Sequence, residues 1–438
     1  DTASTGVNKI QAGNLKMEVT YKNTVGGGFT EVSKETPVFN NDARWEPGHV
    51  EFVVLKVKNI GTLALKYKLG INIASETGST NVYGNGFKLS DYIKFAVIDG
   101  DKSDLGRDEL VTKAGAGTVL NAGYADEDHH LVPVGKETAE DASSKTVTLV
   151  VWMPKSVGNE ANYKVAEGIT APSIDLGINV VATQDMVEND SFNNKYDKDA
   201  EYPTTADNAA DLQAALAAGK DVMLTKSVAL TAPLSISKDV TITGNGYAVI
   251  SEYPVDVAPT AEVTFDGVNF AVPKNNNNNA SSVYASRLEG KVVFDGCTFT
   301  NPQWECIQIT PKDGAEIVVT NCTFIVDGTG TYAHGAKVER MLHIQNTEAT
   351  GDYTVTITNN KFIGIDKVRN SVIDVDDIKA FGNVICGGNS FATADGTSVT
   401  TLDDPLIYVN LNRKYDAASV ATNTFAQFTQ TPAAALQH

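Results

Sequence analysis

FDGVNF, at residues 265–270, is the stretch that decides the fold, because it returns in altered form five more times toward the C-terminus. The later copies end at Phe299, Phe324, Phe362, Phe391 and Phe425 and read FDGCTF, VTNCTF, ITNNKF, CGGNSF and VATNTF. A phrase that recurs every few tens of residues indicates one supersecondary unit stacked on copies of itself, and these copies are β in character. The repeat therefore predicts a right-handed parallel β-helix in the second half of the chain.

The residue two positions before each phenylalanine defines a second column of the predicted stack. If the coils stack in register, the asparagines of this column can hydrogen-bond along the stack. Cys297 and Cys322 would then lie on neighbouring coils about 4.8 Å apart, a spacing that permits a disulfide. The alternative is that both are small buried hydrophobic residues. The members of the column are Val268, Cys297, Cys322, Asn360, Asn389 and Asn423.

A second strand is predicted after four of the phrases, in ECIQIT (305–310), RMLHIQ (340–345), SVIDVD (371–376) and LIYVNL (406–411). Successive side chains of a strand point to opposite faces, so the apolar residues of these strands should face the core. They are Ile307, Ile309, Leu342, Ile344, Ile373, Val375, Ile407 and Val409.

Five polar residues on or beside the opposite, outward face form the candidate ligand site: Glu305, His343, Asp374, Asp376 and Tyr408. Paired carboxylates there can act as general acid and base in a glycoside hydrolase or polysaccharide lyase, or hold Ca²⁺ against a uronic acid. The competing interpretation is a solvated strand face, which carries polar residues in any case. No Lys or Arg of the column supplies the base of a lyase, and Trp304 is the one nearby sugar-stacking platform. We therefore assign no catalytic residue.

The first half of the chain reads as a different domain. Alternating or continuous apolar runs rich in Val and Ile predict strands at 51–59, 63–73, 92–98, 146–153 and 174–183. The stretches 100–116 and 126–131 read as loops. Several strands without intervening helices predict an antiparallel β-sandwich of jelly-roll or immunoglobulin-like type.

The composition changes near residue 185 and marks a domain boundary. Residues 186–203 are polar and predict a linker. TTADNAADLQAALAAGK, which follows, predicts a short helix capped by Thr205 or Asp207 and ended by Gly219, placed to cover the first coil. The expected order is a donor strand at 1–11, a sandwich at 12–185, the linker, the β-helix at 204–426 and a tail at 427–438.

Charge and motif content narrow the class of protein. The formal net charge of −19 argues against binding of nucleic acid or anionic membrane, because both attract clustered Lys and Arg. The sequence contains no run of about 18 apolar residues, so it predicts no membrane span. The chain starts at Asp1 rather than Met, from which we expect a mature secreted protein that has lost its signal peptide.

Metal and cofactor motifs are weak. The four cysteines match no CxxC pair, and there is no HExxH, GxSxG or phosphate-binding loop. His129 and His130 follow three acidic residues, but adjacent residues on a loop seldom share one metal ion. An acidic surface loop is the better interpretation, so we expect no metal and no cofactor.

The polar N-terminal stretch DTASTGVNKIQ precedes the first expected strand, AGNLKMEVT, and has no evident partner strand of its own. It can fray in solvent, as termini usually do, or add as a strand to the sheet edge of another subunit. A head-to-tail contact that does not close generates a filament. The candidate donor residues are Asp1, Thr2, Ala3, Ser4, Thr5, Gly6, Val7, Asn8, Lys9, Ile10 and Gln11.

Five blocks of residues 1–200 follow one another in a distinctive order: DTASTGVNKIQAGNLKMEV, RWEPGHVEFVVLKVKNIGTLALKYKLGINI, LSDYIKFAV, VVWMPKSVGNEANY and IDLGINVVATQDMVENDSFNNKYD. In this order they resemble the TasA and camelysin family of Gram-positive surface proteins. The resemblance implies a jelly roll, release by a dedicated signal peptidase, and fibres of a biofilm matrix or cell surface joined by N-terminal strand donation. The peptidase label of camelysin-like members is not transferred, because no zinc motif supports it.

Together these features predict an extracellular homopolymer of identical subunits. The N-terminal jelly roll would form the filament, and the β-helix would serve as a surface, bundling or glycan-contacting module. The alternative is a polysaccharide lyase or glycoside hydrolase that acts on the β-helix face.

Overall fold

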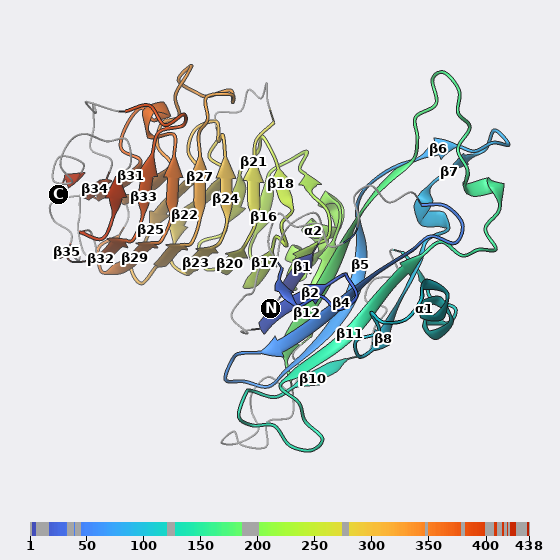
Figure 1. The fold of residues 1–438 in the computed structure, drawn as a ribbon. Coiled ribbons are helices and arrows are strands. Elements are labelled where there is room, and N and C mark those ends of the chain that lie inside the picture. The colour runs from blue at the N-terminus through green and yellow to red at the C-terminus, as the bar shows by residue number, and fades with distance from the viewer. Residues whose placement is uncertain are drawn as a thin grey trace. The chain divides into compact units, whose positions relative to one another are not determined.

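A computed structural model gives the structure of most of the chain. It describes residues 2–5, 17–32, 39, 45–120, 128–185, 201–273, 280–346, 349–377, 382–398, 407–409, 414–415, 418, 421–425 and 436–437. The chain divides into two compact units, Asp1–Pro203 and Thr204–His438. Both are built almost wholly of strands (Figure 1). The predicted all-β class, with a β-sandwich followed by a parallel β-helix, is confirmed.

The first unit is a sandwich of two antiparallel sheets, with strand orders β1-β12-β5-β10 and β3-β2-β4-β11-β8-β9. A small hairpin, β6 with β7, extends one end. The strands are β1 (Thr2–Thr5), β2 (Met17–Lys22), β3 (Thr30–Glu31), β4 (Val50–Asn59), β5 (Leu65–Thr77), β6 (Ser79–Thr80), β7 (Gly86–Phe87), β8 (Lys94–Asp99), β9 (Thr118–Val119), β10 (His129–Leu131), β11 (Ser144–Trp152) and β12 (Ser173–Gln184). Two short 3₁₀ turns are η1 (Leu89–Asp91) and η2 (Asn159–Ala161).

The core of the sandwich follows from strand alternation. Buried residues alternate with half-buried ones along β2, and Leu55, Tyr67 and Leu69 are fully buried between the sheets. The five strands expected from apolar patterning match β4, β5, β8, β11 and β12. Alternation of apolar and polar residues was sufficient to predict these strands, because one face of each strand packs against the opposite sheet.

Two stretches expected to be loops carry regular structure. Arg107–Ala114 forms helix α1, of which Leu110 is the one buried residue. Leu110 packs with Val50, Val150 and Trp152 on the outer face of the six-stranded sheet. His129–Leu131 forms β10, which pairs with the start of β5. Both were missed because neither has the apolar periodicity on which sequence reasoning relies.

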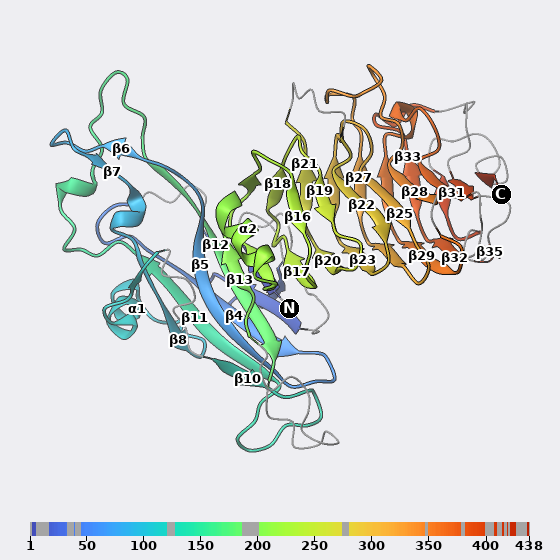
Figure 2. The ribbon, with the colours of Figure 1, turned by 180° about the vertical axis from the view of Figure 1, so that it is seen from behind.

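The second unit is a parallel β-helix with three sheets along its length (Figure 2). The first sheet contains β13 (Thr204–Ala206), β14 (Val222–Leu224), β17 (Val240–Thr243), β20 (Glu262–Asp266), β23 (Lys291–Asp295), β26 (Glu316–Thr320), β29 (Tyr353–Thr358), β32 (Gly382–Gly387) and β35 (Lys414–Tyr415). The second contains β15 (Val228–Ala229), β18 (Ala248–Ile250), β21 (Asn269–Ala271), β24 (Thr298–Thr300), β27 (Thr323–Ile325), β30 (Lys361–Ile363), β33 (Ser390–Ala392) and β36 (Thr424–Phe425).

The third sheet contains β16 (Leu234–Ile236), β19 (Val255–Val257), β22 (Val283–Leu288), β25 (Ile307–Pro311), β28 (Leu342–Asn346), β31 (Ile373–Asp377), β34 (Ile407–Val409) and β37 (Leu436–Gln437). A 3₁₀ turn, η3 (Ile365–Lys367), lies between β30 and β31. Strand β37 falls in the range expected to be a tail, and it pairs with β34.

The phenylalanines of the repeated phrase form a continuous stack inside the β-helix. From Phe270 to Phe425 neighbouring ring centroids are 4.6–5.2 Å apart, and the ring planes are within 13° of parallel. Each phenylalanine pairs in register with the next, as in Phe299 with Phe324. The predicted in-register stacking of coils is therefore confirmed.

The asparagine column is hydrogen-bonded as predicted. Asn389 Oδ1 accepts from the backbone N of Asn360 at 3.0 Å, and Asn423 Oδ1 accepts from the backbone N of Asn389 at 2.8 Å. Each amide nitrogen donates back to a carbonyl of the preceding coil, as Asn389 Nδ2 does to Ile357 O at 3.0 Å. These bonds satisfy polar groups that would otherwise be buried without partners.

The four cysteines are free and buried. Cys297 Sγ donates to Phe265 O at 3.2 Å, and Cys322 Sγ donates to Phe294 O at 3.5 Å. These thiols thus bond to the preceding coil as the asparagine amides do farther along. Of the two expectations for this pair, the structure matches small buried residues rather than a disulfide.

Helix α2 (Ala209–Ala217) covers the first coil as expected. Its Leu212 and Leu216 are fully buried in the β-helix core, and it packs against β13, β14 and β16. The capping residue is Asn208, whose side chain accepts from the backbone N of Asp211 at 2.9 Å, so the assignment to Thr205 or Asp207 was wrong. Gly219 ends the helix with φ +69°, a conformation that glycine adopts without strain.

Candidate functional site

Three of the five candidate ligand residues meet in one cluster on the third sheet of the β-helix. His343 on β28 pairs in register with Asp374 on β31, and Glu305 lies just before β25. Asp376 and Tyr408 have backbone positions on β31 and β34, but their side chains lie outside the described residues.

Arg340 is the centre of this cluster. Its Nε donates to Asp374 Oδ2 at 2.6 Å, and its Nη1 donates to Glu305 Oε1 at 3.2 Å. The same Glu305 oxygen lies 3.1 Å from His343 Nδ1. The ionic cluster, defined as Glu305, Arg340, His343 and Asp374, thus joins three successive coils through alternating acidic and basic groups.

The ionic cluster is buried, which corrects the expectation of an open, solvated face. Glu305 is 0% exposed, His343 4% and Asp374 6%. Burial of ionised groups is tolerated when they are paired, and the guanidinium supplies that pairing. Glu305 Oε2 and His343 Nε2 are buried and have no hydrogen-bond partner in the described structure.

A second layer of charged residues surrounds Glu339, next to the ionic cluster. Glu339 Oε1 lies 3.5 Å from Arg340 Nη1, while Glu339 Oε2 lies 2.6 Å from His334 Nε2 and 3.5 Å from Arg369. The His334 ring in turn packs 5.2 Å from the Trp304 ring. The predicted sugar-stacking platform is therefore in contact with this layer.

Sequence reasoning missed Arg340, although a signal was present. Arg340 precedes Leu342 by two residues, as Glu305 precedes Ile307, and Ile307 pairs with Leu342 in the third sheet. Extending the strand register backward by two positions places Arg340 beside Glu305. The prediction that no Lys or Arg accompanies the outward-facing polar residues was therefore wrong. Arg340, just before β28, lies beside Glu305.

The electrostatics of the ionic cluster keep Arg340 in its charged form. Burial works to lower the pKa of Arg340, but Asp374 and Glu305 together hold that pKa above its ordinary value. The charged guanidinium thus holds Glu305 of the preceding coil and Asp374 of the next coil in place.

A second carboxylate pair was not singled out from sequence. Asp266 and Asp295 end β20 and β23 and pair in register, one in each FDG phrase. Burial, and then the neighbouring Asp295, raise the pKa of Asp266 to about 6. Asn321 Nδ2 donates to Asp295 Oδ1 at 2.9 Å. The signal was the Asp-Gly that occurs in both FDG phrases.

The two adjacent histidines of the first unit point to different partners. His129 is 8% exposed and packs on Tyr67 with ring centroids 4.8 Å apart. His130 Nδ1 lies 2.6 Å from Asp185 Oδ2. Within the described residues, no group of three or more His, Cys, Asp or Glu side chains could hold a metal ion.

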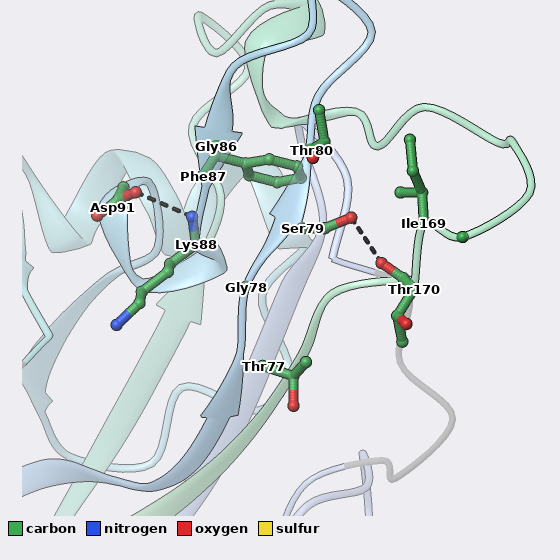
Figure 3. A pocket seen from close by; sticks show the side chains of 11 residues that line it. Thr77, Gly78, Ser79, Thr80, Gly86, Phe87, Lys88, Asp91, Ile169 and Thr170 are labelled. Carbon is green, nitrogen blue, oxygen red and sulfur yellow. Dashed lines mark hydrogen bonds between the residues drawn. The ribbon is translucent and has the colours of Figure 1, made fainter.

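A hollow of about 700 Å³ lies beside the β6–β7 hairpin (Figure 3). Ser79 Oγ donates to Thr170 O at 2.6 Å across one side, and the backbone N of Lys88 donates to Asp91 Oδ2 at 3.0 Å on the other. Its wall offers no nucleophile with an activating partner. It is lined by Thr77, Gly78, Ser79, Thr80, Gly86, Phe87, Lys88, Asp91, Gly168, Ile169 and Thr170.

The predicted donor segment is partly described, and it has a partner in its own chain. Strand β1 pairs antiparallel with β12, with Thr2 opposite Val181 and Thr5 opposite Ile178. The expectation that this stretch has nothing of its own to pair with was therefore wrong. The other candidate donor residues lie outside the described residues: Asp1, Gly6, Val7, Asn8, Lys9, Ile10 and Gln11.

Comparisons with known proteins find only distant structural similarity. No family model matches the sequence, and no curated protein matches it. One solved structure, a catalytic domain of a GH87 α-1,3-glucanase variant with tetrasaccharides, is 12% identical with a TM-score of 0.27, covering 91% of this chain and 72% of that one. A second GH87 catalytic domain, with nigerose, is 10% identical with a TM-score of 0.24, covering 90% and 80%. Similarity at this level carries no argument about fold or activity.

The described helices also bear on membrane insertion. None of them has both the length and the apolar character needed to cross a bilayer.

Proposed function

We propose that this chain is a secreted structural subunit that assembles with identical copies into an extracellular filament by exchanging its N-terminal strand. The observation that carries the proposal is the position of β1. It lies at the edge of the four-stranded sheet and is paired only with β12 among the described strands. The resemblance of residues 1–200 to the TasA and camelysin family supports the same assignment.

The β1–β12 contact is suited to exchange between copies. It consists of four residue pairs, at Val181, Val180, Asn179 and Ile178 of the twelve-residue β12. Among the described residues, no strand pairs with Ser173–Gly177 on this edge. Antiparallel pairing is made by main-chain groups, so an identical strand from another copy can take the same register. Exchange that does not close on itself generates a filament.

A paired cysteine substitution tests strand exchange directly. Ser4 lies opposite Asn179, and directly opposed antiparallel residues have Cα atoms about 4.5–5.5 Å apart, within disulfide range. Under conditions that yield fibres, we expect Ser4→Cys with Asn179→Cys to give a covalent ladder on non-reducing gels. Each single variant should give no species larger than a dimer.

A matched deletion completes this test. Removal of residues 1–11 should abolish fibres in negative-stain electron microscopy while the β-helix remains folded. A cross-linked monomer as the sole product of the paired variant, or fibres from the deleted chain, would show that β1 stays in its own subunit.

The second candidate function is action on a glycan by the β-helix, as a hydrolase or lyase. The observation that favours it is that Glu305 and Asp374 both bind Arg340 and that His343 lies 3.1 Å from Glu305, next to Trp304. Its test is release of soluble sugar from a panel of α- and β-linked polysaccharides. We expect Glu305→Gln to remove any such release, whereas unchanged release would place the chemistry elsewhere.

A further inference from the structure

The hollow beside the β6–β7 hairpin has walls that are fixed by hydrogen bonds. Ser90 donates to the Glu76 carboxylate through its backbone N at 2.9 Å and through its hydroxyl at 2.8 Å, which ties η1 to the end of β5. The backbone N of Lys88 donates to Asp91 on the same wall (Figure 3). The volume of about 700 Å³ is that of a small-molecule site. Walls that are already in place spare a ligand the cost of ordering them.

The turn of the hairpin is organised by one buried asparagine. Asn81 is 4% exposed, and its Oδ1 accepts from the backbone N of Tyr83 at 3.0 Å and of Asn85 at 2.9 Å. Its Nδ2 donates to Glu160 O at 3.1 Å, and its backbone forms an antiparallel bridge with Tyr163. The turn and the segment from Glu160 to Tyr163 are therefore joined into one frame.

This frame presents two tyrosines to solvent. Tyr83 is 66% exposed and Tyr163 is 36% exposed. Both lie close to the hollow along the frame, because Tyr163 bridges to Asn81, which directly follows Thr80 of the wall, and Tyr83 comes two residues after Asn81. A tyrosine ring offers an apolar face and a polar hydroxyl at once, which suits a ligand that has both kinds of surface.

The lining of the hollow has the same mixed chemistry and no net charge. Lys88 and Asp91 are the charged residues of the lining, and their charges are opposite. Phe87 and Ile169 are its large apolar residues, too few to hold a purely hydrophobic ligand. A sugar ring combines hydroxyl groups at its rim with an apolar face and carries no charge, so it matches this lining. The hydroxyl-bearing residues are Thr77, Ser79, Thr80 and Thr170.

We propose that this hollow binds a neutral oligosaccharide. One sugar unit lies in the hollow, where the hydroxyls of Thr77 and Thr170 exchange hydrogen bonds with it and Ile169 contacts its apolar face. Tyr83 and Tyr163 contact the sugar units that extend beyond the hollow. The site binds without cleaving, because its wall has no activated nucleophile. It belongs to the first unit alone and depends neither on strand exchange nor on the ionic cluster.

Gly86 allows the hollow to be filled without strain in the backbone. Gly86 lines the hollow in strand β7, and a Cβ added to it would meet no atom within 4 Å. Gly86→Leu should therefore fold and occupy the space of the ligand. Gly28 provides the matched control, since a Cβ there also meets no atom within 4 Å and Gly28 is not part of the lining. Gly28→Leu adds the same side chain to the same unit outside the hollow.

Nuclear magnetic resonance of the full-length protein, labelled at its isoleucine and threonine methyl groups, measures binding. The probes are cellotetraose, laminaritetraose, maltotetraose and chitotetraose, with trigalacturonate as a charged comparison. We expect at least one neutral probe to shift the Ile169 and Thr170 methyl signals. Gly86→Leu should abolish these shifts, and Gly28→Leu should leave them unchanged. Thr77→Val with Thr170→Val keeps the shape of the wall but removes two hydroxyls, so it should weaken binding by about tenfold.

Four outcomes would overturn the proposal. They are no shift with any neutral probe, tighter binding of trigalacturonate than of every neutral probe, and sugar binding that Gly86→Leu leaves unchanged. The fourth is a shift of the same signals with protein concentration alone, which would show that a second copy occupies the hollow. Circular dichroism separates loss of binding from loss of the fold, and the paired valine variant decides if Gly86→Leu does not fold. Fibres are not needed for these measurements, so a failure here is distinct from a failure of strand exchange.

Discussion

Arg340 is the residue on which the buried charges of the β-helix depend. Arg340→Met would leave Glu305 and Asp374 as buried carboxylates without their cation. Removal of one partner of a buried ion pair costs about 3–5 kcal/mol, and we expect about 3 kcal/mol because Arg340 is 19% exposed. The measurement is calorimetric unfolding of the second unit.

A surface pair supplies the matched control for Arg340→Met. Lys312 lies 3.1 Å from Glu289, with both side chains at least 32% exposed, so Lys312→Met should cost about 1 kcal/mol or less. The triple change Arg340→Met, Glu305→Gln and Asp374→Asn removes the charges together and should recover part of the loss. Equal effects of the two single methionine variants would contradict the role assigned to Arg340.

The residues of the ionic cluster show which properties of single residues the sequence could predict and which it could not. It found Glu305, His343 and Asp374, because alternation and coil register place them on neighbouring coils. It could not show that they are buried, since burial depends on the segments that pack outside the strands. It missed Arg340, the first residue of the expected strand 340–345, because alternation puts this position on the side of Leu342, which faces the core, and not on the side of His343.

At the scale of single elements, the asparagine column explains how coils are held in register. Asn389 accepts from both the backbone N and the Nδ2 of Asn360, and it donates to Ile357 O. Asn389→Ala would leave these buried groups unpaired, at an expected total cost of about 3 kcal/mol. Chemical unfolding of the second unit measures this loss.

Thr354→Ala is the control for the asparagine column. Thr354 lies on β29 of the neighbouring coil with its side chain exposed, so its removal should change stability by less than about 0.5 kcal/mol. If Asn389→Ala is as mild as this control, main-chain pairing alone must set the register.

Elements differed in how well sequence predicted them, for physical reasons. The repeated phenylalanine phrase predicted the stacked coils, because the same side chain returns at the same place in each coil. Helix α1 was missed because its one buried residue, Leu110, leaves no apolar stripe to detect. Strand β1 was given no partner in its own chain, because pairing by main-chain groups leaves no mark on side-chain pattern.

At the scale of the whole molecule, the two units carry different structural features. The first unit carries the strand proposed for exchange, and the second carries the ionic cluster and the repeated coils. The boundary at Pro203 and Thr204 lies at the end of the stretch expected to be a linker. Tyr202, in this stretch, contacts three charged residues far away in the chain, Lys66, Lys68 and Asp128, so the composition of the stretch gives no sign of these contacts.

The phenylalanine stack and the asparagine column have a consequence for how duplication or loss of a repeat changes the length of the β-helix. Each coil makes its bonds to the coil before it and the coil after it, and the same positions meet at every step. A duplication that copies one full repeat, such as residues 298–322, would restore the strand pairing at both of its junctions. Loss of part of a repeat would break the register. The gene can therefore lengthen or shorten this domain in whole coils, with the helix at its start left unchanged.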